Sequence, residues 1–394
     1  MTPTIYRSLA RSWKVLLTRQ RGLPASTTVA SGNNVAGALG RPRSARPALP
    51  APHPRLMARA AGSTAGHIGF IGAGGVMGLP MAMHVCDKYD GLERLHVYSR
   101  TAAKVEPLLQ RCPQRVQWHD SARQVAEHCE MLVCMVGYPQ DVEEVMLHPE
   151  TGVLAAACGA RTTPVIIDCT TSDPNLAERL AEAAAQRGSI AYDAPVTGGD
   201  VGARAGTLSV LVGCDTRRGE RERAVRARVE RLLQCFAGRV TFFEGVGSGQ
   251  RAKLANQIAI ASTMVGMAEA LVYAHRVGLP LAAWLEAVSQ GAAASFSLNV
   301  LGKRAGLERD FAPGFYVEHF VKDLGIALNE AQRLRLCLPG LALAQQLYLS
   351  LMAYGDGRKG TQALLLALER MNGRDGVNAT EMDKMSAPER EQRP

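Results

Sequence analysis

Acidic residues are absent from the first 86 positions of the sequence, where the first aspartate or glutamate to appear is Asp87. Residues 1–66 hold ten lysines and arginines, which leaves 35 basic and 36 acidic residues in the rest of a chain whose formal net charge is +9. The basic excess therefore belongs to a tail, and a nearly neutral body does not indicate a nucleic-acid partner. A tail rich in arginine, serine, alanine and proline predicts an organelle transit peptide, with a disordered basic arm as the alternative. We expect import into mitochondria, or alternatively into plastids.

Long apolar runs are also missing. After the tail, the longest uncharged apolar stretch is 258–268, which is too short to span a bilayer, so we expect a soluble mature protein with no membrane partner. The nine cysteines are scattered and include no Cys-x-x-Cys pair. This spacing indicates neither a disulfide framework nor a metal site and favours buried, reduced thiols.

The body of the chain alternates between strand-like and helix-like segments. Strands are predicted near the start of 67–85 and at 95–100, 131–137, 164–171, 191–196, 207–214 and 240–245, with helices at 121–128, 174–187 and 218–235. This alternation predicts an α/β, Rossmann-like domain with a mostly parallel sheet covered on both faces.

Strand signals stop after residue 248. Residues 249–277 are predicted to form one helix, roughly 43 Å long, that ends at Gly278 and Pro280. Further helices are predicted at 281–290, 295–306, 319–335, 339–354 and 360–371. We therefore expect a tail (1–66), a dinucleotide-binding domain (67–246), an all-helical C-terminal domain (247–373) joined by the long helix, and a disordered tail (374–394).

A glycine-rich turn follows the first predicted strand. "GAGGVMG" matches the G-x-G-x-x-G dinucleotide fingerprint except that Met77 takes the third glycine's position and Gly78 follows it. Placed between a strand and a helix, such a turn lets the backbone approach a pyrophosphate at the helix N-terminus. The predicted cofactor loop consists of Gly72, Ala73, Gly74, Gly75, Val76 and Met77.

The end of the second strand decides between NAD and NADP. An acidic residue there would bind the ribose 2′-hydroxyl, but the sequence has Ser99, Arg100, Thr101 and Lys104. A cation and hydroxyl groups suit a 2′-phosphate better. We therefore expect NADP, with NAD possible.

Four motifs resemble those of the β-hydroxyacid dehydrogenase family, which includes 3-hydroxyisobutyrate dehydrogenases and glyoxylate/succinic semialdehyde reductases and is related to 6-phosphogluconate dehydrogenase. They are "IGFIGAGGVMGLPMA", "DAPVTGGDVGARAGTLSVLVG", "GSGQRAKLANQ" and "FVKDLGIAL", and the similarity spans about 67–371. The resemblance implies a Rossmann-like domain, a helical domain and an active site in the cleft between them. The apolar character of the predicted helical domain separately favours a dimer or tetramer.

The resemblance also assigns roles to residues. Lys253 matches the catalytic lysine and Asn256 an amide that orients the substrate, while Thr197, Gly198 and Gly199 match the loop that holds the substrate carboxylate. Cofactor contacts are implied for Met135, Val136, Thr171 and Lys322. Thr197 stands where serine is commoner in the family, and "GYPQD" (137–141) replaces a stretch that often starts with Leu-Pro.

Lys253 and Asn256 are three residues apart and therefore lie on one, otherwise mostly apolar, helix face. Burial, the helix N-terminus and Lys322 should all lower the pKa of Lys253 and fit it for general acid/base catalysis. The sequence thus predicts a hydride-transferring oxidoreductase for a short β-hydroxyacid or its semialdehyde, similar to 3-hydroxyisobutyrate dehydrogenase. An NADPH-dependent glyoxylate/succinic semialdehyde reductase is the alternative, and a non-catalytic dinucleotide-binding protein is a third possibility. No metal is expected.

Overall fold

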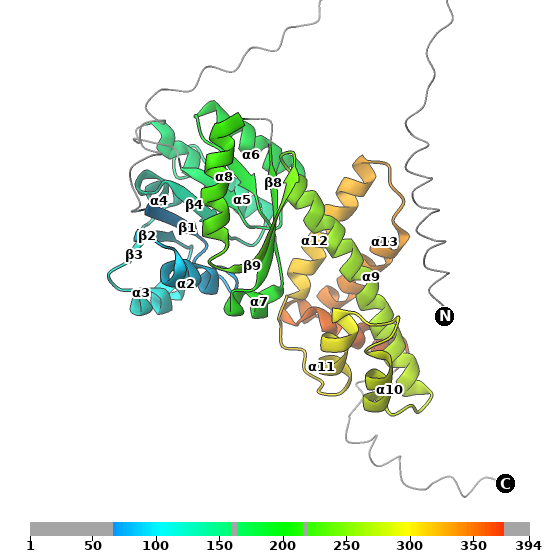
Figure 1. Cartoon of the computed structure of the whole chain (residues 1–394). Coiled ribbons are helices and arrows are strands. Elements are labelled where there is room, and N and C mark those ends of the chain that lie inside the picture. The colour runs from blue at the N-terminus through cyan, green and yellow to red at the C-terminus, as the bar shows by residue number, and fades with distance from the viewer. Residues whose placement is uncertain (1–65, 159–163, 216–218, 374–394) are drawn as a thin grey trace, which may run out of the picture. The chain divides into compact units, whose positions relative to one another are not determined.

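The computed structural model describes residues 66–158, 164–215 and 219–373. The predicted transit peptide, apart from Gly66, and the predicted C-terminal tail lie outside these residues. The described chain consists of an α/β part followed by a helical part (Figure 1).

The α/β part is built on a nine-stranded sheet with the order β3-β2-β1-β4-β5-β6-β8-β7, in which β9 also pairs with β8. Pairing is parallel except where β8 meets β6 and β7. Strands β2 and β3 lie on one side of β1, and β4 lies on the other side. The strand order therefore reverses next to β1, and such folds bind ligands at the carboxyl ends of the strands at this point. The strands are β1 Gly66–Ile71, β2 Leu92–Tyr98, β3 Val116–Trp118, β4 Met131–Cys134, β5 Val165–Asp168, β6 Ala191–Asp193, β7 Val196–Thr197, β8 Leu208–Cys214 and β9 Ala237–Glu244.

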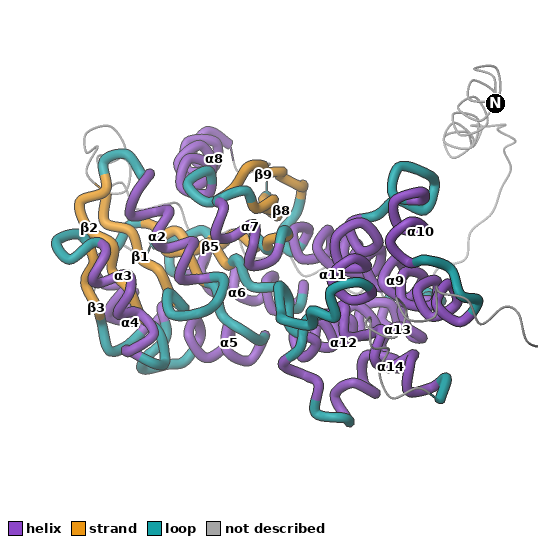
Figure 2. Tube along the Cα trace, turned by 90° about the horizontal axis from the view of Figure 1, so that it is seen from below, coloured by secondary structure: helices purple, strands orange, loops and turns teal. Residues whose placement is uncertain are grey.

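Helices cover both faces of the sheet, as the tube in Figure 2 shows. Buried side chains of α2, α3 and α8 share one apolar cluster with the sheet, and those of α4, α5 and α6 share another on the opposite face. This confirms the predicted Rossmann-like layers. The helices of this part are α2 Gly78–Lys88, α3 Glu106–Arg111, α4 Ala122–His128, α5 Pro139–Leu147, α6 Pro174–Gln186, α7 Gly199–Ala205 and α8 Gly219–Leu233, with 3₁₀ turns at Ala102–Val105 and Val153–Cys158.

The helical part is organised around α9, which spans Ser248–Arg276 and has the predicted 29 residues. Its buried side chains form one apolar core with those of the helices that follow it. By length and composition alone α9 could cross a membrane, but this packing identifies it as the core helix of its region. The remaining elements are α10 Leu281–Val288, a π-helical turn Ser297–Gly302, α11 Lys303–Gly306, α12 Val317–Arg333, α13 Pro339–Ala353, 3₁₀ turns Asp356–Arg358 and Thr361–Ala363, and α14 Leu364–Met371.

The cysteines mostly follow the expectation of buried, free thiols. Of those whose side chains are described, six are buried, Cys112 is partly exposed and Cys337 is exposed. Cys158 has no described side chain. The prediction of burial was therefore wrong for Cys337, which lies in the turn between α12 and α13.

Four histidines that the sequence did not single out form a connected cluster between the sheet and α4. His67 Nδ1 lies 2.9 Å from His96 Nε2, and His96 Nδ1 lies 2.9 Å from His119 Nε2. The His128 ring lies 5.3 Å from that of His96 and 5.0 Å from that of His119. Burial, followed by the neighbouring histidines, lowers the pKa of His96 to about 3. Across the three described segments, no group of three or more His, Cys, Asp or Glu side chains is arranged to hold a metal ion.

This cluster predicts a loss of stability in acid. Because the folded-state pKa of His96 lies below its ordinary value near 6.5, the unfolded chain binds more protons, and stability falls as the pH drops below about 6.5. The other charged groups around it are Arg94, Glu93, Asp120 and Glu127. We expect His96→Leu to flatten the decline in melting temperature between about pH 7.5 and 5.5, measured by scanning calorimetry. His84→Leu, outside the cluster, should keep the wild-type slope, and equal slopes in all three proteins would contradict the prediction.

Candidate active site

The loop between β1 and α2 depends on Gly72 and Gly78. Gly72 has a φ of +85°, and a Cβ there would lie 2.0 Å from the Met135 carbonyl oxygen. At Gly78 a Cβ would lie 2.1 Å from the Gly72 carbonyl oxygen. The third glycine of the fingerprint is therefore required one position late, while Met77 occupies the N-cap position of α2 and its side chain makes no capping hydrogen bond. Gly75 and Val76 are exposed at the tip of the loop, as a phosphate-binding loop requires.

The predicted ribose-binding groups lie beside this loop. A Cβ on Gly74 would lie 2.8 Å from Lys104 Cβ and 2.9 Å from Ser99 Oγ. Arg100 Nη1 donates to Asp141 Oδ1 at 3.0 Å. The Arg100 side chain is 76% exposed, so this ion pair is weak and leaves the guanidinium available to a phosphate.

The ends of β4 and β5 meet on the other side of the loop. The Met135 N–H donates to the Ile71 carbonyl at 2.9 Å, and the Val136 N–H donates to Thr170 Oγ1 at 3.0 Å. Thr171 follows directly, and its carbonyl faces the helical part. The predicted nicotinamide-side residues are therefore adjacent to one another and to the glycine loop.

Lys322 of α12 joins these strand ends to the helical part. Its Nζ donates to the carbonyl oxygens of Thr171 at 2.6 Å and Gly137 at 3.1 Å, and lies 3.1 Å from Asp323 Oδ1. Two of the three ammonium protons therefore have carbonyl acceptors, and Asp323 forms an ion pair with the group. In this structure Lys322 holds the loops that line the predicted cofactor site.

Lys253 lies in the second turn of α9 and is buried, at 6% exposure. Burial is the largest cause that lowers its pKa, to about 8, and the nearby Lys322 lowers it further, while Asp323 opposes both. Asn256 Nδ2 donates to Gln257 Oε1 at 2.9 Å, and Gln257 Nε2 donates to Asp323 Oδ2 at 2.6 Å. One polar network thus contains Asn256 and Lys322 and lies within electrostatic reach of Lys253.

The predicted substrate loop follows β7. Gly198 and Gly199 have φ values of +128° and +62°, which only glycine adopts readily. A Cβ on Gly199 would lie 3.3 Å from the Gly314 carbonyl oxygen, and the Asp200 N–H donates to that oxygen at 3.2 Å. The loop therefore contacts the segment before α12. No hydrogen bond between described residues joins Thr197 to Lys253.

These features fit a dinucleotide. The glycine turn leaves no room for side chains where a pyrophosphate must approach, hydroxyl and cationic groups lie at its ribose end, and a buried amine of lowered pKa lies beyond the opposite end.

Two family profiles match the chain in succession. Residues 67–245 match the NAD-binding domain of 6-phosphogluconate dehydrogenase, and residues 247–368 match the NAD-binding domain of NADP-dependent 3-hydroxyisobutyrate dehydrogenase. A probable 3-hydroxyisobutyrate dehydrogenase-like protein of Arabidopsis thaliana is 50% identical over 77% of this chain and 86% of its own length. The 3-hydroxyisobutyrate dehydrogenase of Pseudomonas aeruginosa is 37% identical over 73% of this chain and 93% of its own.

The chain belongs to the 3-hydroxyisobutyrate dehydrogenase family. A solved structure of the Mycobacterium tuberculosis 3-hydroxyisobutyrate dehydrogenase superposes with a TM-score of 0.66 at 24% identity, and covers 77% of this chain and 99% of its own. That likeness shows the fold, which agrees with the predicted architecture. As a member of this family the protein is an NAD(P)-dependent hydroxyacid dehydrogenase.

Two polar residues of this family member were missed as partners in the site. Asp323 lies within the matched "KDLG" motif, but only Lys322 was singled out; its burial at 1% exposure beside a lysine and a glutamine makes it the central anion of the network. His319, one turn before Lys322, lies against the Tyr138 ring with centroids 5.3 Å apart. The unusual "GYPQD" stretch could have indicated this contact, because it contains the aromatic ring of Tyr138.

Proposed function

We propose that this protein interconverts a short β-hydroxyacid and its semialdehyde, with Lys253 as general acid and base. The observation that supports this role is a buried lysine whose pKa is lowered to about 8, so both protonation states are accessible near neutral pH. Thr197, Gly198 and Gly199 would bind the substrate carboxylate, and Asn256 would orient the reacting group.

When bound, the nicotinamide ring supplies or accepts the hydride. In reduction, the Lys253 ammonium donates a proton to the carbonyl oxygen as negative charge develops there. In oxidation, the neutral amine takes the proton from the substrate hydroxyl. Lys322 orients the loops at Gly137 and Thr171 and favours the neutral form of Lys253.

A panel of substrates tests this proposal. We expect NADPH-dependent reduction of methylmalonate semialdehyde and the reverse oxidation of 3-hydroxyisobutyrate, followed by absorbance at the nicotinamide band. Glyoxylate and succinic semialdehyde test the alternative, a reductase. No turnover with any of these compounds, in a protein that binds NADPH, would contradict the proposed substrate class.

Arg100 favours the reductive alternative, because NADPH is the common donor for reductions and no carboxylate follows β2. We expect Arg100→Ala to raise KM for NADPH about tenfold and KM for NADH less than twofold, since a charge-assisted contact to phosphate contributes roughly 1.5–3 kcal/mol. Arg179→Ala, an exposed arginine on α6, is the control. Equal effects on the two cofactors would remove the argument for NADP.

We also propose mitochondrial import, supported by the basic, acid-free tail and by the mitochondrial naming of the Arabidopsis relative. The cellular location of a fluorescent fusion of the full chain tests this proposal.

The proposed domains are 67–246 and 247–373. A homo-oligomer is supported by α9, since only 39% of its most apolar stretch is buried within one chain. Light scattering after size-exclusion chromatography would give the number of copies.

A further inference from the structure

Helix α9 begins without a capping side chain of its own. Its N-cap residue is Gly247, with a φ of +78°, and the helix has no acidic residue in its first turn. The first N–H groups of a helix lack partners within it and need acceptors from elsewhere. Since Lys253 follows only a turn later, whatever supplies those acceptors also sets where Lys253 lies.

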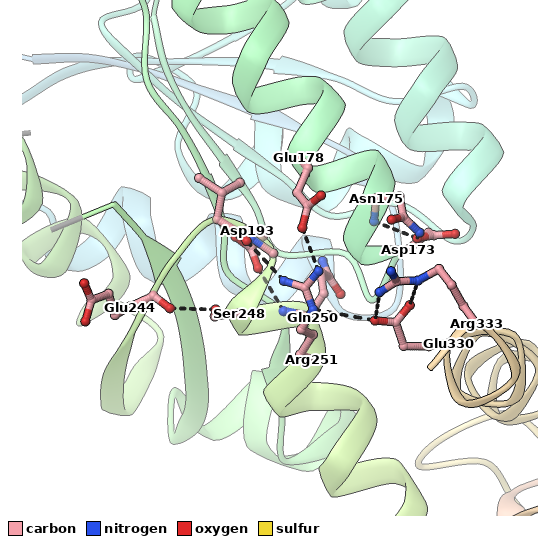
Figure 3. Close-up of polar contacts among 12 residues, drawn as sticks. Asp173, Asn175, Glu178, Asp193, Glu244, Ser248, Gln250, Arg251, Glu330 and Arg333 are labelled. Atoms are coloured by element: carbon pink, nitrogen blue, oxygen red, sulfur yellow. Dashed lines mark hydrogen bonds and ion pairs between the residues drawn. The ribbon is translucent and has the colours of Figure 1, made fainter. Parts of the chain in front are cut away.

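Asp193, the last residue of β6, supplies two of these acceptors. Its Oδ1 accepts the Gly247 N–H and its Oδ2 accepts the Gln250 N–H, each at 2.8 Å (Figure 3). These are the N-cap and N3 positions, which a local capping box serves in other helices. Here one buried carboxylate serves both from a strand more than fifty residues earlier in the chain.

Glycines at positions 249 and 213 allow Asp193 to approach the first turn of α9. A Cβ on Gly249 would lie 2.6 Å from the Asp193 carbonyl oxygen and 2.3 Å from that of Leu211, while a Cβ on Gly213 would lie 2.3 Å from Asp193 Oδ1. Glycines in "LVGC" and "GSGQ" therefore allow the aspartate of "DAPVTGG" to reach the helix. Two of the four motifs, the one that starts at Asp193 and the one that starts at Gly247, therefore meet at this carboxylate.

Gln250 extends the connection to the cofactor side. It is fully buried; its Oε1 accepts the Ser172 N–H at 2.9 Å and its Nε2 donates to the Thr170 carbonyl at 2.8 Å. These residues flank Thr171, whose carbonyl accepts from Lys322. The first turn of α9 is thus fixed to both the substrate-loop strand and the loop at the predicted nicotinamide side.

We propose that Asp193 is a positioning residue, which fixes Lys253 relative to the substrate loop that begins four residues later, at Thr197. The proposal rests on the proposed role of Lys253. The negative charge also offsets the positive end of the α9 dipole. Burial raises the pKa of Asp193 to about 6, against the opposing effect of the backbone N–H groups, so the carboxylate is ionised at neutral pH.

Asp193→Asn tests this inference, because the amide keeps one acceptor but turns an NH₂ group toward the other N–H donor. At pH 7.5 we expect kcat about tenfold below wild type, and about a hundredfold below it for Asp193→Ala, with the Kd for NADPH within twofold, since small misplacement of a reacting group costs up to about a hundredfold. Asp356→Asn is the matched control: Asp356 is also a buried aspartate, but it pairs with Lys359 and Arg370, so α9 keeps its cap. Its kcat should stay within about twofold of wild type.

Hydrogen exchange of the peptide 247–257 supplies a readout that needs no turnover. Exchange should speed up in Asp193→Asn and stay slow in Asp356→Asn. If Asp193→Asn showed faster exchange but an unchanged kcat per NADPH-binding site, the positioning role would be overturned. If its exchange were unchanged, Asp193 would not cap α9. If the wild type turned over no substrate in the panel, the proposed function would fail while the exchange experiment still tested the cap. Asp193→Asn covers the case in which Asp193→Ala does not fold.

Discussion

Lys253→Ala should lower kcat by about a thousandfold or more, because general acid/base groups contribute roughly 10² to 10⁴ to the rate and Lys253 would also stabilise the developing alkoxide. The Kd for NADPH, measured by fluorescence titration, should change less than twofold. Lys253→Arg should be almost as inactive, since a guanidinium keeps the charge but does not release its proton near neutral pH. The two variants together separate the charge of Lys253 from its proton.

The pH dependence has opposite signs in the two directions. Reduction requires the ammonium form, so its rate should fall as the pH rises through about 8; oxidation requires the neutral amine and should accelerate over the same range. Lys303→Ala, which removes an exposed lysine of α11, should leave both profiles unchanged. Lys253→Ala activity within tenfold of wild type would refute the mechanism.

The charge of Lys253 should also affect the stability of the fold. The folded-state pKa of Lys253 is lowered from 10.5 to about 8, so between these values the unfolded chain binds more protons and stability rises with pH. At neutral pH the buried ammonium is a cost to the fold. Lys253→Met should therefore be inactive and yet melt at a higher temperature, which is a common signature of a functional buried charge.

The features that the sequence predicted are those set by local patterns. The 29 residues of α9 follow from apolar spacing that ends at Gly278 and Pro280, and the glycine turn follows from its place between strand and helix. By contrast, β3 spans only Val116–Trp118, too short for an alternating pattern. The antiparallel pairing of β7 with β8 depends on which strands meet in space.

The same distinction holds within the site. Lys253, Asn256 and Lys322 belong to recognisable motifs, and the structure places Asn256 and Lys322 in one network near Lys253. The contact between Arg100 and Asp141 joins residues 41 positions apart, and no local pattern encodes it. Polar contacts between residues distant in the sequence could not be predicted from local motifs and are known only from the structure.

Substitutions of Asp323 should change both the pH dependence and the rate of the reaction. Asp323 raises the pKa of Lys253 while burial and Lys322 lower it. Without this anion, two ammonium groups would share a poorly solvated region, so the pKa of Lys253 should fall further. The loss of reductive activity with rising pH should then begin below the wild-type value near 8, and kcat for reduction at pH 7.5 should drop severalfold.

Asp323→Ala separates charge from structure in this prediction. It also leaves Gln257 Nε2 without its acceptor and Lys322 without its ion pair, and breaking a buried pair costs about 3–5 kcal/mol. We expect a clear fall in melting temperature and roughly a hundredfold loss of kcat, since the loops at Gly137 and Thr171 lose their anchor. Glu330→Gln, a carboxylate on the same helix that pairs with Arg333 and Arg251, should keep the wild-type pH profile. If Asp323→Asn kept that profile too, Asp323 would serve packing alone, and the pKa of Lys253 would be set by burial and Lys322.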